Sequence, residues 1–195
     1  MKTLKLQVLL LFTAIVTMNA HAQSIKLVDG SPDVLKGQTS INTEFTYDNM
    51  SVGKFDNEKD YLTKKTEEYN KKEPGRGDAW AKSWEADRKN QFEPKFNELF
   101  SKHSEMSLDA KAKYTLIFKT TFTEPGFNVY ITRKNAKISG DVWIVETANR
   151  DNVVAKLALE NSPGRTFGGG DYDTGTRIAE AYAAAGKALG KKIKD

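Results

Sequence analysis

The segment 113–160 constrains the fold most, because it holds three apolar runs rich in β-branched and aromatic residues: YTLIFKTTF, SGDVWIVE and NVVAKLALE. This composition predicts strands of one sheet. In the middle run, Val142 and Ile144 fall on one face while Trp143 and Val145 fall on the other, so we expect both faces to meet helices or a neighbour. The polar stretch ETANRDN between the last two runs predicts a hairpin connection of several residues.

Two segments have the periodicity of amphipathic helices. Residues 79–103 repeat an aromatic or long side chain every four positions, and Pro94 interrupts them, which predicts a kink or two helices meeting end to end. Residues 177–195 carry an apolar stripe of Ile178, Tyr182, Ala185, Leu189 and Ile193. Beside that stripe, small residues including Gly186 and Gly190 would let the helix approach the sheet closely.

The tryptophans of the first helical segment admit two interpretations. Trp80 and Trp84 lie one turn apart. An aromatic series at helical spacing usually packs against a sheet, but two indoles at this spacing could also stack on a sugar or another flat ligand. Trp80 and Trp84 are therefore candidate ligand-binding residues.

Between the first strand and this helix lie a charged stretch and a loop. Residues 41–53 alternate like a strand, and residues 56–73 are dense in charge with helical spacing of Tyr61 and Tyr69, which predicts a short exposed helix. In the loop PGRGD that follows, we expect Gly77 to end the loop and Asp78 to cap the next helix. The RGD tripeptide is too short to indicate adhesion.

These elements predict an α/β (α+β) fold: a single mixed β-sheet of about 4–5 strands, packed by a long kinked helix and a C-terminal helix. A right-handed crossover would place the first strand parallel to the strand that follows Lys113. We divide the chain into a signal peptide (1–22), an extended lead-in that could pair at a sheet edge (23–40) and a single α/β domain (41–195).

The N-terminus has the three parts of a secretory signal peptide. Lys2 and Lys5 precede an apolar run from Val8, and the small-residue site AHA ends at Ala22. We expect cleavage after Ala22 and export to the periplasm or the cell exterior. The apolar run is shorter than the roughly 20 residues of a spanning helix, and no second segment is apolar enough to cross a bilayer, so the mature chain should be soluble.

Composition excludes several classes of function. The formal net charge is +4, two of these charges belong to Lys2 and Lys5, and the remaining basic residues alternate with acidic ones, so we expect no nucleic-acid partner. The chain has no cysteine, and His103 is the one histidine after residue 22. Cys–His and Ser–His–Asp nucleophile systems and the usual zinc sites are therefore nearly excluded, and we expect no cofactor and no metal.

The stretch GGGDYDTGT, from Gly168 to Thr176, is the other candidate site. Its backbone amides could bind an anion, although the two aspartates would repel one. An aspartate pair also occurs in phosphate-transferring hydrolases, and a D-x-D-x-G fragment occurs in calcium loops. Alternatively, the glycines allow a tight crossing and Asp173 or Thr174 caps the last helix. The candidate ligand-binding residues here are Gly168, Gly169, Gly170, Asp171 and Asp173.

The order of parts resembles a group of small exported bacterial α/β proteins of uncharacterised function. The shared features are a signal peptide, a strand ending VGKF, a long helix, the strands YTLIFKTTF and DVWIVE, and the closing helix RIAEAYAAAGKALGK. The pattern is similar to the periplasmic module of curli-secretion lipoproteins and to the amino-terminal domain of TolB. Unlike the curli-type proteins, this chain has no lipidated cysteine and no membrane-spanning insertions. The resemblance implies a fold and a compartment, and no catalytic residues.

Three functional hypotheses follow. The first is a non-enzymatic exported cell-envelope protein that binds a protein partner or forms a homo-oligomer through its sheet edge or aromatic helix. The second is a periplasmic protein that binds a small ligand or carbohydrate near Trp80, Trp84 and the glycine-rich loop. The third is a carboxylate-dependent hydrolase, whose two carboxylates the sequence does not identify.

Overall fold

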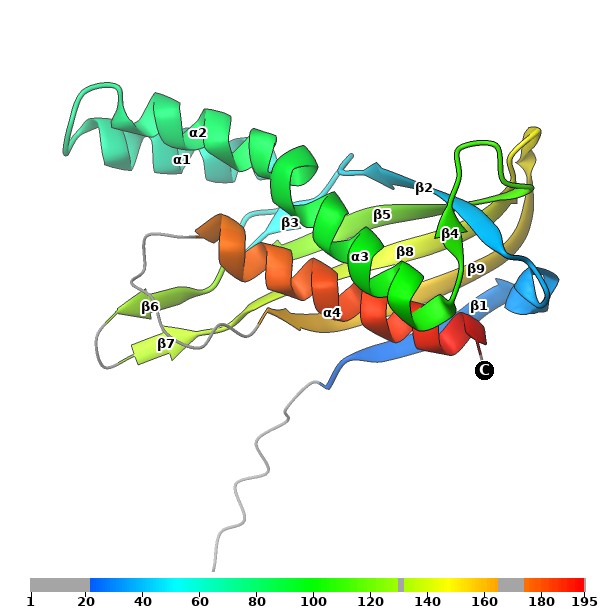
Figure 1. Cartoon of the computed structure of the whole chain (residues 1–195). Coiled ribbons are helices and arrows are strands. Elements are labelled where there is room, and N and C mark those ends of the chain that lie inside the picture. The colour runs from blue at the N-terminus through cyan, green and yellow to red at the C-terminus, as the bar shows by residue number, and fades with distance from the viewer. Residues whose placement is uncertain (1–21, 130–131, 165–173, 195) are drawn as a thin grey trace, which may run out of the picture.

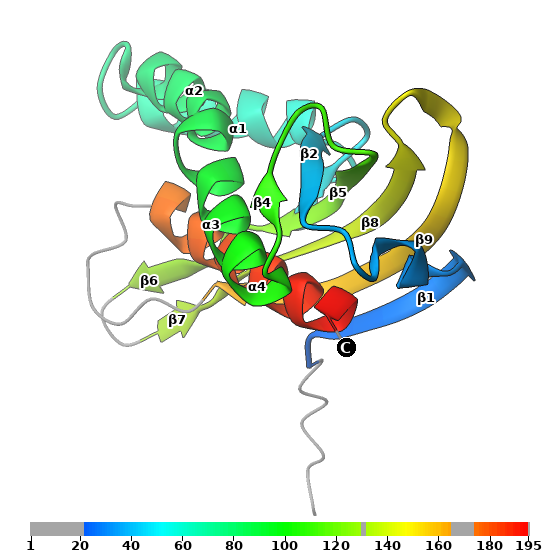
Figure 2. The ribbon, with the colours of Figure 1, turned by 45° about the vertical axis from the view of Figure 1, so that its right-hand side comes forward.

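A mixed sheet with helices on one face forms the body of the protein in the computed structural model, which describes residues 22–129, 132–164 and 174–194. Within these residues the sheet has seven strands in the order β1-β9-β8-β5-β2-β4, and β3 also pairs with β5. Figure 1 and Figure 2 show α3 and α4 side by side across one face of this sheet, with α1 and α2 projecting beyond its end.

The strands are β1 (Ser24–Gly30), β2 (Ser40–Thr46), β3 (Ser51–Val52), β4 (Ser107–Leu108), β5 (Tyr114–Glu124), β6 (Phe127–Val129), β7 (Thr132–Lys134), β8 (Ala136–Glu146) and β9 (Asn149–Gly164). The helices are a short 3-10 helix (Pro32–Leu35), α1 (Glu58–Asn70), α2 (Arg76–Asp87), a π turn (Arg88–Phe92), α3 (Glu93–Ser104) and α4 (Thr174–Lys194). The strands β6 and β7 form a separate two-stranded ribbon.

The predicted mixed α/β sheet is confirmed, but it has more strands than predicted. The strand β2 runs parallel to β5, as the crossover rule required, while β5, β8, β9 and β1 follow one another antiparallel. The extra strands are β1, from the lead-in, and the two-residue β3 and β4, which are too short to show an alternating pattern. The β8–β9 turn is also shorter than predicted, because Glu146 pairs with Asn149 and only two residues connect them.

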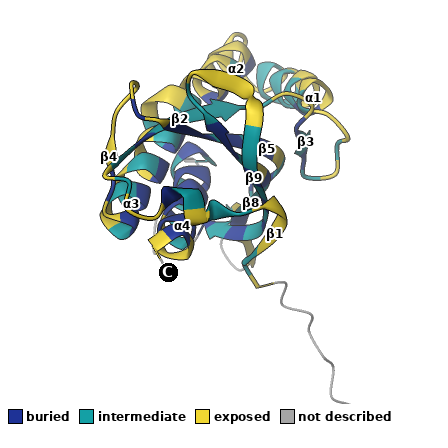
Figure 3. Ribbon diagram, turned by 90° about the vertical axis from the view of Figure 1, so that its right-hand side faces the viewer, coloured by how far each residue is buried: buried dark blue, intermediate teal, exposed yellow. Residues whose placement is uncertain are grey.

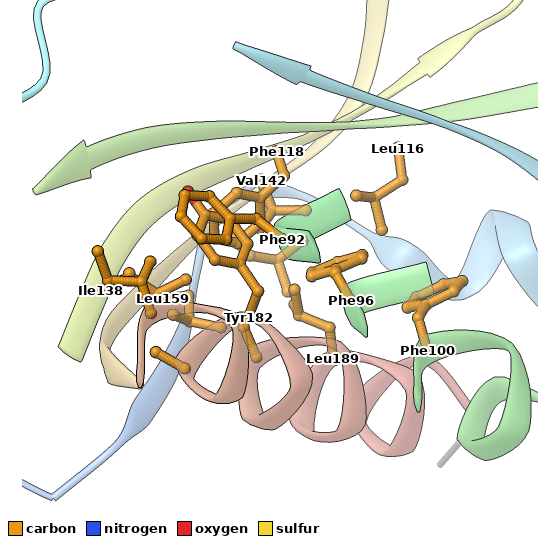
Figure 4. Packing of buried hydrophobic residues seen from close by; sticks show 14 of the residues in the cluster. Phe92, Phe96, Phe100, Leu116, Phe118, Ile138, Val142, Leu159, Tyr182 and Leu189 are labelled. Atoms are coloured by element: carbon orange, nitrogen blue, oxygen red, sulfur yellow. The ribbon is translucent and has the colours of Figure 1, made fainter. Parts of the chain in front are cut away.

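The two faces of the sheet have different environments. Side chains on the helix-covered face are fully buried, including Leu116, Phe118 and Val142 (Figure 4). On the opposite face, Trp143 is half-buried and lies beside the amines of Lys119 and Lys156, 3.1 and 4.9 Å from its ring centroid. Figure 3 shows α3 and α4 on the same side of the strands, so helices of the described residues cover one face and side chains shield the other.

The long helical segment is interrupted at Pro94, as predicted, and a π turn precedes the proline. The amide of Glu93 donates to the carbonyl of Arg88, five residues earlier, and α3 begins with Pro94 in its first turn. The wider turn accommodates a residue that has no amide hydrogen and would crowd the carbonyl of Asn90 in a regular helix.

The aromatic series packs against different elements before and after this π turn. Phe92 stacks on Tyr182 of α4 with ring centroids 5.2 Å apart, and Phe96 packs against Phe118 of the sheet (Figure 4). Trp80 and Trp84 instead contact Tyr61 of α1. The prediction of one continuous stripe facing the sheet is therefore wrong for the two tryptophans, because α2 projects beyond the end of the sheet and packs against α1 there.

The start of α2 differs from the predicted cap. Gly75, with φ 82°, occupies the N-cap position and makes no side-chain hydrogen bond. Gly77 lies inside the helix, where a Cβ would come 2.1 Å from the Thr66 carbonyl oxygen. Asp78 lies in the first turn, where its carboxylate accepts a hydrogen bond from the side-chain amide of Asn70 rather than capping the helix. Contact between the antiparallel α1 and α2 decides this arrangement.

The helix α4 is confirmed, and all five residues of its predicted apolar stripe are buried. Its glycines, however, allow close approach of α3 rather than of the sheet. A Cβ on Gly186 would lie 2.2 Å from the Phe96 carbonyl oxygen, and one on Gly190 would lie 2.7 Å from the Phe100 carbonyl oxygen. The backbones of α3 and α4 therefore touch at these two positions.

Substitution of Gly186 tests this backbone contact. We expect Gly186→Ala to lower the free energy of unfolding by about 1–3 kcal/mol, because the new methyl group must push α3 away from α4. Without such a clash, alanine would stabilise a helix interior by roughly 1 kcal/mol relative to glycine, so the sign of the change is diagnostic. Urea unfolding followed by circular dichroism measures it. Lys187→Ala, at the exposed neighbouring position, serves as the control, and a stabilised Gly186→Ala protein would contradict the proposed contact.

Candidate functional site

A hollow of about 210 Å³ lies where the end of α2 and the π turn meet the start of α4. Its lining residues come from these two places in the chain, which are far apart in sequence. They are Trp80, Ser83, Trp84, Asp87, Gln91, Thr174 and Gly175. The hollow is smaller than the roughly 300–1,000 Å³ of sites for drug-sized molecules, so its size suits a small ligand.

Two indole rings form the aromatic wall of the hollow. The ring centroids of Trp80 and Trp84 are 5.7 Å apart, and Trp84 also packs against Tyr61 at 5.1 Å. Trp84 is only 4% exposed, whereas Trp80 is half-buried. Burial raises the pKa of Tyr61 well above its usual value, so its phenol stays neutral. The wall is therefore rigid, aromatic and uncharged.

Polar side chains form the opposite wall. The amide of Gln91 donates to Asp87 Oδ1 at 2.7 Å. A Cβ on Gly175 would lie 2.1 Å from Asp87 Oδ2, so the carboxylate lies directly against the first turn of α4. A negative charge at this end of a helix complements the helix dipole. Asp87 therefore joins α2 to α4 while presenting its carboxylate to the hollow.

The ion pair between Arg88 and Glu58 lies beside Trp84 and joins α1, the end of α2 and the residue that follows β2. The Arg88 guanidinium donates to both carboxylate oxygens of Glu58, at 2.5 and 2.6 Å, and Trp84 Nε1 donates to the same carboxylate at 2.6 Å. The guanidinium also lies 4.3 Å from the ring centroid of Tyr47. Because Arg88 and Glu58 are both mostly buried, each depends on the other for compensation of its charge.

The structure brings together only part of the predicted site. Trp80 and Trp84 line one hollow, as the ligand-binding hypothesis required. Gly168, Gly169, Gly170, Asp171 and Asp173 lie outside the described residues, in the segment 165–173 that ends beside Thr174.

Sequence reasoning missed Ser83, Asp87 and Gln91. These residues recur every four positions and lie three residues after Trp80, Trp84 and Arg88. This spacing places them beside the aromatic series on the same helix, and it is the signal that could have identified them.

A second surface of interest is the outer edge of β1. This strand pairs with β9 on one side, and no strand of the described residues pairs with its other side. Two apolar side chains are exposed there, Leu27 at 51% and Val28 at 64%. The register shifts between Leu27 and Asp29, so Val28 is a bulge.

The imidazole of His103 and the grouping of the acidic side chains bear on metal binding. Loss of hydration, together with the charges of Lys187 and Lys191, lowers the pKa of His103 below its usual value. Within residues 22–129, 132–164 and 174–194, no group of three or more His, Asp or Glu side chains could hold a metal ion. In the same part of the chain, no helix combines the length and apolar character that a membrane span needs.

Comparison with known proteins yields only distant structural similarity. No protein-family model and no curated protein matches the chain. Among solved structures, the chain is similar to the PelC dodecamer from Paraburkholderia phytofirmans, with 8% identity, a TM-score of 0.36, and 84% of this chain and 96% of that chain covered. A variant PelC dodecamer from the same organism gives 9% identity, a TM-score of 0.35, and coverage of 84% and 97%.

The ion pair beneath the hollow is open to a direct test. We expect Glu58→Gln to lower the free energy of unfolding by about 1–3 kcal/mol, because Arg88 would keep a hydrogen-bond partner but lose the charge that compensates its own. Thermal or urea unfolding measures the change. Glu67→Gln, at an exposed position of the same helix, is the matched control, and equal stabilities of the two variants would contradict the role of Glu58.

Proposed function

We propose that this chain is a non-enzymatic, exported cell-envelope protein that acts by binding another polypeptide along β1, and that this polypeptide is a second copy of the chain. The observation that supports the proposal is the seven-residue outer edge of β1, with Leu27 and Val28 exposed. An unpaired edge offers a row of backbone donors and acceptors, to which another strand can add.

The two edge strands of the sheet, β1 and β4, differ in how well they would support such pairing. At one edge, β4 has only two residues, Ser107 and Leu108. At the other edge, the seven residues of β1 are enough for a full set of ladder hydrogen bonds. Proteins often protect an edge with a lysine and a bulge, and Lys26 and Val28 provide both here. For the proposed contact, these two features must fit the partner strand rather than exclude it.

A symmetric antiparallel pairing of two β1 strands satisfies this condition. Lys26 and Asp29 pair with Ala158 and Lys156 of β9, two residues apart, so the bulge brings both side chains to the same face. Pairing about Leu27 then sets Lys26 opposite Asp29 of the second copy, and Leu27 opposite Leu27 of the second copy. Opposite charges and apolar side chains directly across a ladder both stabilise it. The sheets of the two copies would become one.

Export follows in the proposal from the signal-peptide pattern of residues 1–22. Cleavage after Ala22 would leave Gln23 as the first residue, immediately before β1. Processing would therefore place β1 next to the N-terminus of the mature chain. The resemblance to exported envelope modules stays a prediction of the sequence.

The export step has a simple test. We expect the full chain, produced in a bacterial host, to accumulate outside the cytoplasm with Gln23 at its N-terminus, because signal peptidase requires the small residues of the AHA site. Intact-mass spectrometry of the periplasmic fraction measures this. Ala22→Arg should block processing, while Gln23→Asn should not. Cytoplasmic accumulation of the unprocessed wild-type chain would contradict the export proposal.

Charge reversal tests the proposed β1 contact. We expect sedimentation of the wild-type protein to show a monomer–dimer equilibrium. Lys26→Asp should weaken the dimer on the order of tenfold, because each of the two symmetric pairs changes from attraction to repulsion. The double variant Lys26→Asp with Asp29→Lys should restore the dimer, since the opposite charges face each other again.

The control for this experiment is Lys111→Asp, which makes the same charge change in an exposed loop. It should leave the dimer unchanged. A wild-type protein that is monomeric at every concentration, or a dimer unaffected by Lys26→Asp, would rule out pairing of two β1 strands. Failure of the double variant to recover would reject the proposed register.

A further inference from the structure

We propose that the hollow between α2 and α4 binds a single ring of a neutral saccharide, with Trp80 and Trp84 contacting its apolar face and the side chains of Ser83, Asp87 and Gln91 binding its hydroxyl groups. This activity goes beyond self-association through β1 and does not depend on it.

The aromatic wall provides the first part of the argument. Sugar rings present clusters of C–H groups, and a flat, rigid aromatic surface binds such clusters by dispersion and burial of apolar area. Trp84 is fixed by its indole hydrogen bond to Glu58. Trp80 packs edge-on against Tyr61 and Tyr69, at 5.8 and 5.5 Å, yet stays half-buried. The pair is therefore held in place before a ligand arrives.

The polar wall provides the second part. Within one hollow lie a carboxylate, a primary amide and two hydroxyl groups, from Asp87, Gln91, Ser83 and Thr174. A carboxylate accepts hydrogen bonds, an amide both donates and accepts, and a hydroxyl does either. Neighbouring sugar hydroxyls need this combination of donors and acceptors. The Gln91–Asp87 hydrogen bond orients both groups before a ligand binds.

Size and charge narrow the choice of ligand. A hollow of about 210 Å³ is of the order of one sugar ring and is too small for a nucleotide or an extended peptide. The carboxylate of Asp87 disfavours phosphates and sugar acids, because like charges would be brought together. An organic cation is the rival class, since indoles and a carboxylate also suit a quaternary ammonium group. The amide and the hydroxyl groups favour the saccharide, because a quaternary ammonium group cannot form hydrogen bonds with them.

The tryptophan side chains themselves provide the readout. The chain has three tryptophans, and the third, Trp143, lies on the opposite face of the sheet. A 15N–1H spectrum of the labelled protein therefore shows three indole N–H signals, which Trp→Phe variants assign. The probes are glucose, galactose and N-acetylglucosamine, with choline as the cationic alternative.

We expect at least one of these sugars to shift the Trp80 and Trp84 signals in a saturable manner while the Trp143 signal stays in place. Asp87→Asn should weaken binding about tenfold, because a charged hydrogen-bond acceptor becomes neutral. Asp141→Asn, the same substitution at an exposed position of β8, should leave the affinity unchanged. Thermal unfolding of each variant shows whether it is folded.

The same spectra contain the results that would overturn the proposal. These are no shift of the Trp80 and Trp84 signals with any of the sugars, equal shifts of all three tryptophan signals, or a response to choline alone. If Asp87→Asn does not fold, Ser83→Ala replaces it, with Ser107→Ala on β4 as its control. Equal affinities of these two variants would contradict the assigned polar contacts. Because the readout is local to the hollow, a monomeric protein could still give the expected result.

Discussion

The π turn at Arg88–Phe92 is the constraint on which the rest of the structure depends. The wider turn accommodates Pro94 and joins α2, which projects beyond the end of the sheet, to α3, which lies across one face of it. Phe92, Phe96 and Phe100 enter the core between the sheet and α4, while Trp80 and Trp84 of α2 pack against α1.

Two buried polar residues of α4, Tyr182 and Arg177, are paired, which explains how the core tolerates them. The hydroxyl of Tyr182 lies 2.6 Å from that of Thr120, and burial raises the pKa of this tyrosine well above its usual value. At the start of α4, Arg177 is 6% exposed and donates to the carbonyl of Pro125 and to the hydroxyl of Thr174. These contacts bind α4 to the turn after β5 and thereby fix one wall of the hollow.

The hollow is lined by the end of α2 and the start of α4, and Figure 1 shows these two places away from β1. No residue lines both surfaces, and the sheet core separates them. Binding at one would therefore leave the other accessible, so a dimer paired through β1 would present two hollows.

The sequence by itself determined the local elements: the strands β5, β8 and β9, the parallel placement of β2, the break at Pro94 and the buried stripe of α4. Each follows from the spacing of apolar residues within one segment or from the backbone restriction of proline. Only the tertiary structure decided that Gly186 meets α3, that Gly77 lies within a helix and that Asp87 reaches the start of α4. The reason is physical, because these contacts join segments far apart in the chain, and spacing within one segment does not specify which backbone will lie against it.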